Sequence, residues 1–157
     1  MKKQQLQETI NFLKANGIIH PEVGVVLGTG LGKLVDEIDI EKEIAYEDIP
    51  NFPQATVEFH SGKLIYGNLS GKKVIVMSGR FHVYEGYSLW EVTYGIRTMH
   101  GLGIKQVLIS NAAGAINLNY KKGDLMLIED HINLQGSSPL AFLPFVSKTA
   151  RSFALNE

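Results

Sequence analysis

The feature that most constrains this chain is a short apolar run that leads directly into a glycine-rich loop. Residues 23–27 are rich in valine, and residues 28–32 read Gly-Thr-Gly-Leu-Gly. β-Branched residues favour strands, and glycine favours tight turns. A strand that enters a glycine turn is typical of the opening of an α/β sheet. This segment therefore predicts an α/β domain.

Further segments support that fold class. Leu6, Ile10 and Leu13 recur at helical spacing before Gly17, which predicts an amino-terminal helix with one buried stripe. Ser88 and Glu91 have the spacing of a capping box, so a second helix is expected from there to Gly101. Four more apolar runs are predicted strands, which makes at least five: 63–69, 72–77, 107–109 and 124–128.

Two details of these strands are also predicted. Ser70-Gly71 joins the runs 63–69 and 72–77 as a hairpin. Residues 74–77 and 107–109 have no polar alternation, which predicts strands covered on both faces. The acidic stretch 36–48 is interpreted as irregular, and the whole chain as one domain.

Composition excludes several classes of protein. With 45% hydrophobic and 20% charged residues and a net charge of −1, the chain is neither disordered nor a general polyanion binder. It has no cysteine, which excludes disulfides and thiolate chemistry. It has no apolar run of the ~20 residues that a membrane helix needs, and no signal-peptide core. We therefore predict a cytoplasmic protein that binds neither nucleic acid nor membrane.

The glycine loop fits neither of two familiar nucleotide-binding motifs. The dinucleotide fingerprint needs a glycine where Lys33 stands, and the phosphate loop of nucleotide hydrolases needs Ser or Thr where Leu34 stands. Two readings stay open: a tight turn without a ligand, or a cradle in which backbone N–H groups and the Thr29 hydroxyl bind an oxyanion.

A second segment favours the oxyanion. Arg80 follows the predicted strand 72–77, and in α/β sheets ligands bind outside the carboxyl ends of strands. A guanidinium can bind two phosphate oxygens at once. His82 lies on the same side if the chain is extended there, His60 adds a third possible donor, and Glu85 completes the group. Small residues at 110–114 would let a ligand approach the backbone closely.

Other polar and aromatic residues have plainer interpretations. His100 and His131 are expected to be structural, and Arg97 to be solvated or ion-paired. Tyr84 and Tyr87 can be rim aromatics that fill space.

Taken together, these motifs resemble one family. Residues 28–32, 49–53, 60, 79–87, 111–114 and 130–134 occur in one order and spacing. That pattern is similar to the trimeric, low-molecular-mass purine nucleoside phosphorylases, from about residue 23 to residue 140. The related methylthioadenosine phosphorylases differ at the Arg-Phe-His-Val-Tyr-Glu-Gly-Tyr block. The resemblance implies a three-layer α/β/α fold with a mixed central sheet, phosphorylase/hydrolase-like and incomplete at its carboxy terminus.

The resemblance also implies an activity and roles for single residues. The reaction is reversible phosphorolysis of purine nucleosides, with inorganic phosphate as co-substrate, no metal and no other cofactor. The phosphate-binding set is Thr29, His60, Arg80, His82 and the backbone at Ala112. Tyr84 contacts the ribose, His82 and Glu85 are the catalytic pair, and Glu85 orients His82. The family forms homotrimers.

The chain departs from the family after residue 140. Residues 141–157 do not match the family's next segment, so we divide the chain into 1–140 and a non-matching tail. The purine-binding residues of the family lie beyond that boundary, so none is expected here. We expect a truncated or frameshifted gene, or a fragment. Two alternatives stay open: a catalytically dead phosphate-binding fragment or partner of full-length subunits, and an unrelated nucleotide-binding α/β domain.

Overall fold

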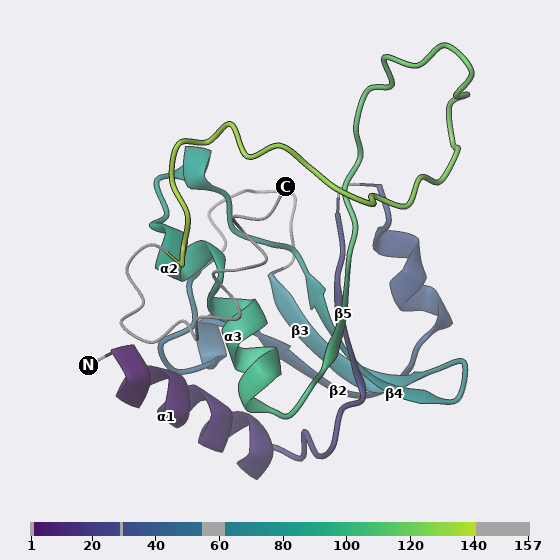
Figure 1. Cartoon of the computed structure of the whole chain (residues 1–157). Helices are drawn as coiled ribbons and strands as arrows, with labels where there is room; N and C mark the ends of the chain where they lie inside the picture. Colours follow the sequence, from purple (N-terminus) through teal and green to yellow (C-terminus); the bar gives the residue numbers. More distant parts are fainter. Residues whose placement is uncertain (1, 29, 55–61, 141–157) are drawn as a thin grey trace. The chain divides into compact units, whose positions relative to one another are not determined.

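The computed structural model describes residues 2–28, 30–54 and 62–140 (Figure 1). The chain divides into two compact units, residues 1–114 and residues 115–157. The first unit holds every helix and strand among the described residues, and residues 115–140 of the second form turns and loops.

A five-stranded sheet forms the centre of the first unit. Its order is β2-β3-β4-β1-β5, in which β1 runs parallel to β4 and β5, while β2, β3 and β4 pair antiparallel. The predicted mixed α/β sheet is therefore confirmed. The strand bounds are β1 Val23–Val26, β2 Asp39–Ala45, β3 Lys63–Leu69, β4 Lys72–Ser78 and β5 Gln106–Ile109.

Helices cover the two faces of this sheet. The longer ones, α1 and α3, lie side by side on one face (Figure 1), where Leu13, Ile75 and Met99 belong to one buried cluster. The 3-10 helix η1 covers the other face with Leu34 and Val35. The helix bounds are α1 Lys2–Ala15, η1 Gly32–Glu37, η2 Tyr46–Asp48, η3 Val83–Glu85, α2 Leu89–Val92 and α3 Tyr94–Gly101.

Several local predictions are confirmed. Ile10 and Leu13 of α1 are buried, and the helix ends before Gly17. Residues 70 and 71 both have positive φ, as in the tight turns that suit hairpins, and they join β3 to β4. The capping box at α2 is present in both directions between Ser88 and Glu91. The predicted helix 88–101 is broken once, at Thr93, into α2 and α3.

The prediction that residues 36–48 are irregular is wrong. They form the end of η1, the strand β2 and the helix η2. Only Ile44 of β2 is buried, so this strand carries almost no hydrophobic signal. It is held instead by its ladder with β3 and by ion pairs of Glu43 with Lys63 and of Glu41 with Lys73.

Two predictions about later strands also need correction. Residues 124–128 form no strand, because their apolar side chains are exposed and no neighbouring strand pairs with them in the described part of the chain. Residues 106–109 do form β5, but Leu108 and Ile109 are 65% and 62% exposed rather than buried.

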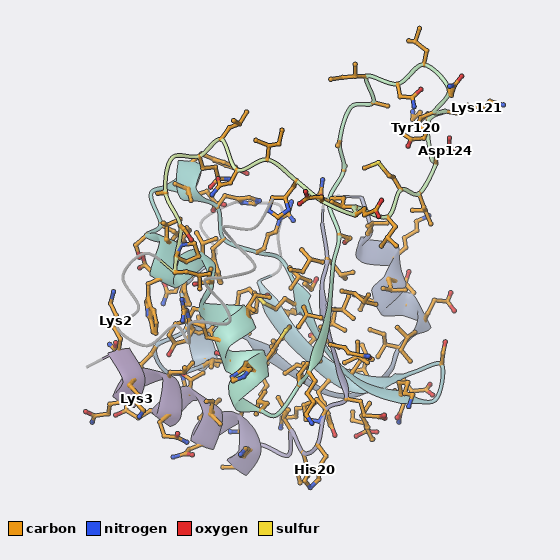
Figure 2. All side chains as sticks on the ribbon, viewed as in Figure 1. Lys2, Lys3, His20, Tyr120, Lys121 and Asp124 are labelled. Carbon is orange, nitrogen blue, oxygen red and sulfur yellow. The ribbon has the colours of Figure 1, made fainter. Side chains whose placement is uncertain are left out.

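The described part of the second unit is a long loop with short hydrogen-bonded turns, among them one at residues 117–120 and one at residues 121–124. Lys121 N–H donates to the Asp124 carboxylate at 2.8 Å, and Asp124 N–H donates back to the Lys121 carbonyl at 3.1 Å. Figure 2 shows these side chains beside Tyr120 at the tip of the loop. Among the residues the structure describes, no helix is long and apolar enough to cross a membrane.

Candidate functional site

The candidate site lies where three parallel strands end. β1, β4 and β5 point the same way, so their carboxyl ends meet at one edge of the sheet. Gly28 follows β1, Arg80 follows β4 and Ser110 follows β5. In open α/β sheets this edge is where ligands bind. The topology therefore brings together three segments that are far apart in the sequence.

The end of β4 is held firmly from the core side. The buried Tyr46 hydroxyl donates to the Gly79 carbonyl at 2.7 Å. Burial raises the pKa of Tyr46, so this hydroxyl keeps its proton and remains a donor. Gly79 has φ +108°, a conformation that favours glycine, and Phe81 is buried against Tyr46. Because alternate residues of an extended chain face opposite sides, Arg80 and His82 face away from Phe81.

Arg80, His82 and Glu85 form one hydrogen-bonded group. The Arg80 Nε–H donates to His82 Nε2 at 3.1 Å, and His82 Nδ1 lies against the Glu85 carboxylate. A nitrogen that accepts from a guanidinium carries no proton, so the network assigns the proton of His82 to Nδ1, which donates to Glu85. The two contacts thus hold the His82 ring in one orientation. The Glu85 carboxylate, which the sequence analysis predicts to orient His82, contacts the ring directly.

Tyr84 forms the outer wall of this group. Its ring stacks on the His82 imidazole, with ring centroids 4.6 Å apart and planes 19° from parallel. Tyr84 is 81% exposed, whereas the side chain of Glu85 is only 6% exposed. The group thus has a buried carboxylate at its base and an aromatic face at its rim.

Ser110 links β5 to both other strands. Its hydroxyl accepts from the Gly28 N–H at 2.9 Å and donates to the Val26 carbonyl at 3.2 Å, and its carbonyl accepts from the Arg80 Nη1 at 3.0 Å. A Cβ on Gly28 would lie 2.4 Å from the Ser110 carbonyl oxygen, so only glycine fits there. The chain after β1 is thus packed directly against the chain after β5.

The predicted site residues divide by position. Arg80, His82 and Glu85 are brought together, Tyr84 is stacked on them, and Ala112 follows two residues after the carbonyl that holds Arg80. Thr29 and His60 lie outside the described residues.

The sequence analysis did not single out Tyr46 or the hydroxyl of Ser110. The signal that could have pointed to the Ser110 hydroxyl is a polar residue at the end of an apolar strand.

The guanidinium of Arg80 is the group that suits this site to an anion. Two of the five Arg80 N–H donors are used in the bonds to His82 and Ser110, which leaves a guanidinium edge for the oxygens of an anion. Within residues 2–28, 30–54 and 62–140, no group of three or more His, Cys, Asp or Glu side chains is placed to hold a metal ion.

A family model described as "Phosphorylase superfamily" matches residues 22–154. The chain belongs to the phosphorylase superfamily. The match covers the whole sheet and every residue of the site described above. Within the matched residues, the site occupies the carboxyl ends of the parallel strands of the sheet.

Similar proteins of this superfamily are phosphorylases of purine nucleosides. The chain is 49% identical over 140 residues to purine nucleoside phosphorylase 1 of Geobacillus stearothermophilus, covering 89% of the chain and 51% of that protein. It is 44% identical over 135 residues to the purine nucleoside phosphorylase of Bos taurus, covering 86% and 47%.

Solved structures agree. One is a purine nucleoside phosphorylase in complex with ribose-1-phosphate, with a TM-score of 0.72 and 49% identity over 77% of this chain and 44% of that one. The chain therefore spans about half the length of the relatives it matches.

Proposed function

We propose that this chain acts in the phosphorolysis of purine nucleosides, and that the group around Arg80 binds inorganic phosphate. The observation that carries the proposal is the Arg80–His82–Glu85 network at the carboxyl ends of three parallel strands. The identity of 44–49% to purine nucleoside phosphorylases supports it. So does the likeness to a phosphorylase that binds ribose-1-phosphate.

Each residue of the group has a different proposed role in binding phosphate. Arg80 supplies a fixed positive charge and parallel N–H donors for two phosphate oxygens. His82 belongs to the predicted phosphate set, and its Nε2 accepts from the Arg80 Nε–H and so helps to direct the guanidinium, while Glu85 holds the His82 ring in orientation. The backbone at Ala112, with Thr29 and His60, completes the predicted phosphate set, and Tyr84 is proposed to contact the ribose.

In this reaction the main task of these residues is to position the phosphate against the sugar. A phosphate oxygen attacks the anomeric carbon of the nucleoside while the bond from that carbon to the purine nitrogen breaks. The electron pair leaves with the purine, which takes up a proton, and the products are free base and ribose 1-phosphate. The sugar passes through an oxocarbenium-like state, as in glycoside hydrolysis. A phosphate dianion held against the sugar both stabilises that charge and captures it.

A second candidate function is suggested by the share of its relatives that the chain covers. The chain spans about half of its relatives, and the sequence predicts no purine-binding residue in it. A chain that binds phosphate without releasing base is therefore the alternative. The homotrimer and the cytoplasmic location remain predictions from the sequence.

The test uses the 157-residue chain, inosine and inorganic phosphate. We expect phosphate binding by titration calorimetry, weakened about tenfold or more in Arg80→Ala, because hydrogen bonds to charged groups are worth roughly 1.5–3 kcal/mol. Arg97→Ala is the matched control. It removes the same side chain from α3, where the guanidinium stacks over Trp90, and it should bind phosphate like the parent.

Hypoxanthine release decides between the two functions. Release that depends on phosphate and is lost in Arg80→Ala supports the enzyme. Phosphate binding without release supports the binding fragment. Equal phosphate affinity in the parent and Arg80→Ala would contradict both.

A further inference from the structure

The hydrogen bonds at the end of β5 depart from the regular pattern of a parallel ladder. Val26 of β1 pairs with Ile109 of β5, and the Ser110 N–H donates to the Val26 carbonyl at 3.1 Å. In a parallel ladder every second residue bonds through its N–H and its carbonyl to two residues of the neighbouring strand that lie two apart. On the β5 side these residues include Val26 and then Gly28. The Ser110 carbonyl should therefore accept from the Gly28 N–H.

In this protein the Gly28 N–H donates elsewhere. Its acceptor is the Ser110 hydroxyl at 2.9 Å, and the Ser110 carbonyl accepts from the Arg80 Nη1 at 3.0 Å. The hydroxyl has thus taken the place of the carbonyl in the ladder. The Ser110 carbonyl is therefore free of Gly28 and accepts a hydrogen bond from Arg80 instead.

The geometry points to Ser110 as a positioning residue, whose hydroxyl satisfies the end of β1 so that its carbonyl can anchor the guanidinium of Arg80. This inference rests on the proposed function, because anchoring matters only if Arg80 binds the anion. The carbonyl and His82 Nε2 together fix the guanidinium at Nη1 and Nε. Two fixed points set the plane of the group and so the direction of its outer edge.

The hydroxyl itself is held in place from both sides. It donates to the Val26 carbonyl at 3.2 Å and accepts from Gly28, so both of its bonds are to β1 or the residues that follow it. Ser110 is partly buried, as is Arg80. An unpaired N–H in such a place is unfavourable, so the Gly28 N–H will find an acceptor whenever one is in reach.

Removing the hydroxyl should therefore move Arg80. In Ser110→Ala the acceptor within reach of the Gly28 N–H is the Ser110 carbonyl, which the regular ladder would use. Gly28 lies against that carbonyl already, since a Cβ there would be 2.4 Å from its oxygen. Arg80 then competes with Gly28 for one carbonyl and loses its fixed direction.

The first measurement is phosphate affinity of the 157-residue chain, with inorganic phosphate as the probe. We expect Ser110→Ala to raise the Kd about tenfold, the scale of one hydrogen bond to a charged group. Ser110→Thr keeps the hydroxyl and suits an extended chain, so it should restore affinity. Thr98→Val is the control: it removes a buried hydroxyl from α3 that donates to the Tyr94 carbonyl and, among the described residues, makes no hydrogen bond to Gly28, Arg80 or Ser110. It should lower thermal stability without changing the Kd.

The second measurement does not need phosphate binding. In nitrogen-15 spectra of the chain, the Arg80 Nε–H signal should be sharp and protected in the parent, in Ser110→Thr and in Thr98→Val, and exchange-broadened in Ser110→Ala. If the parent binds no phosphate, the proposed function fails for this chain, and the spectra alone decide the role of Ser110. An unchanged Arg80 signal in Ser110→Ala overturns the inference. So does a folded Ser110→Thr that behaves like Ser110→Ala.

Discussion

The two strands on either side of β1 have similar compositions and opposite surroundings. In β4, Val74, Ile75, Val76 and Met77 are all buried, at 0–3% exposure. In β5, Leu108 and Ile109 are more than half exposed. Both strands pair with β1 in parallel, so the difference does not come from their ladder with it.

The difference comes from what packs around each strand. β4 has β3 on its other side, helices α1 and α3 on one face and η1 on the other. β5 is the edge strand of the sheet within the described residues. An apolar run therefore shows that a strand can be buried on both faces. Whether it is buried depends on the helices and strands that pack against it in the fold.

The carboxyl end of β5 is held by side-chain as well as backbone hydrogen bonds. Ser110 makes hydrogen bonds to Val26, Gly28 and Arg80, whereas the side chains just before it are exposed. The site edge of the sheet is thus ordered by polar contacts where the apolar covering is thin. This contrast can be tested by matched substitutions in the two strands.

The largest effect is expected in β4. Ile75→Ala removes a fully buried side chain, at 0% exposure, from the main cluster and leaves a cavity. Such changes lower the free energy of unfolding by about 2–5 kcal/mol. Urea unfolding followed by circular dichroism measures this free energy. Ile75→Val is a milder variant, which should lower the free energy of unfolding by about 0.5–1.5 kcal/mol. A loss below that of the valine variant would contradict the central place of β4.

The same chemical change in β5 should matter much less. Ile109 is 62% exposed, so Ile109→Ala should lower the free energy of unfolding by at most about 1 kcal/mol, mainly through strand propensity. The same urea titration measures it, at two protein concentrations. A loss as large as that of Ile75→Ala, growing with protein concentration, would show that another copy covers β5 in solution.

The smallest effect on stability is expected from Leu108→Lys, within about 0.5 kcal/mol, because the side chain is 65% exposed. Its effect on association should be clearer. A lysine on an exposed apolar edge strand opposes pairing with another edge, so sedimentation velocity should show less self-association than in the parent.

The control for that change is Gln106→Lys, which adds the same charge to an exposed polar position of β5. It should reduce association less than Leu108→Lys. Equal reductions by both variants would mean that charge alone, and not the apolar edge, governs association.

Much of the site could be predicted because its residues are close in sequence. Arg80, His82 and Glu85 lie within one short segment after a buried strand, so their meeting requires only an extended chain and one turn. The extended backbone at His82, with φ −123° and ψ 149°, meets that condition. The Glu85 contact then follows from the turn of η3.

Ser110 and β2 could not be predicted in this way. The role of Ser110 depends on Gly28 and Arg80, which reach it only through the pairing of β1 with β4 and β5. β2 depends on a ladder with β3 and on surface ion pairs, and its polar sequence gives no hydrophobic pattern to read.

The sequence by itself determined the elements whose cause is local: the buried stripe of α1, the turn between β3 and β4, the capping box of α2 and the Arg80–His82–Glu85 group after β4. Each depends on propensities and spacings within a few residues. The tertiary structure alone decided that β5 is exposed, that β2 is a strand and that the carbonyl of Ser110 holds Arg80. These features depend on which distant segments become neighbours, and a hydrogen bond or a covered face exists only once that neighbour is in place.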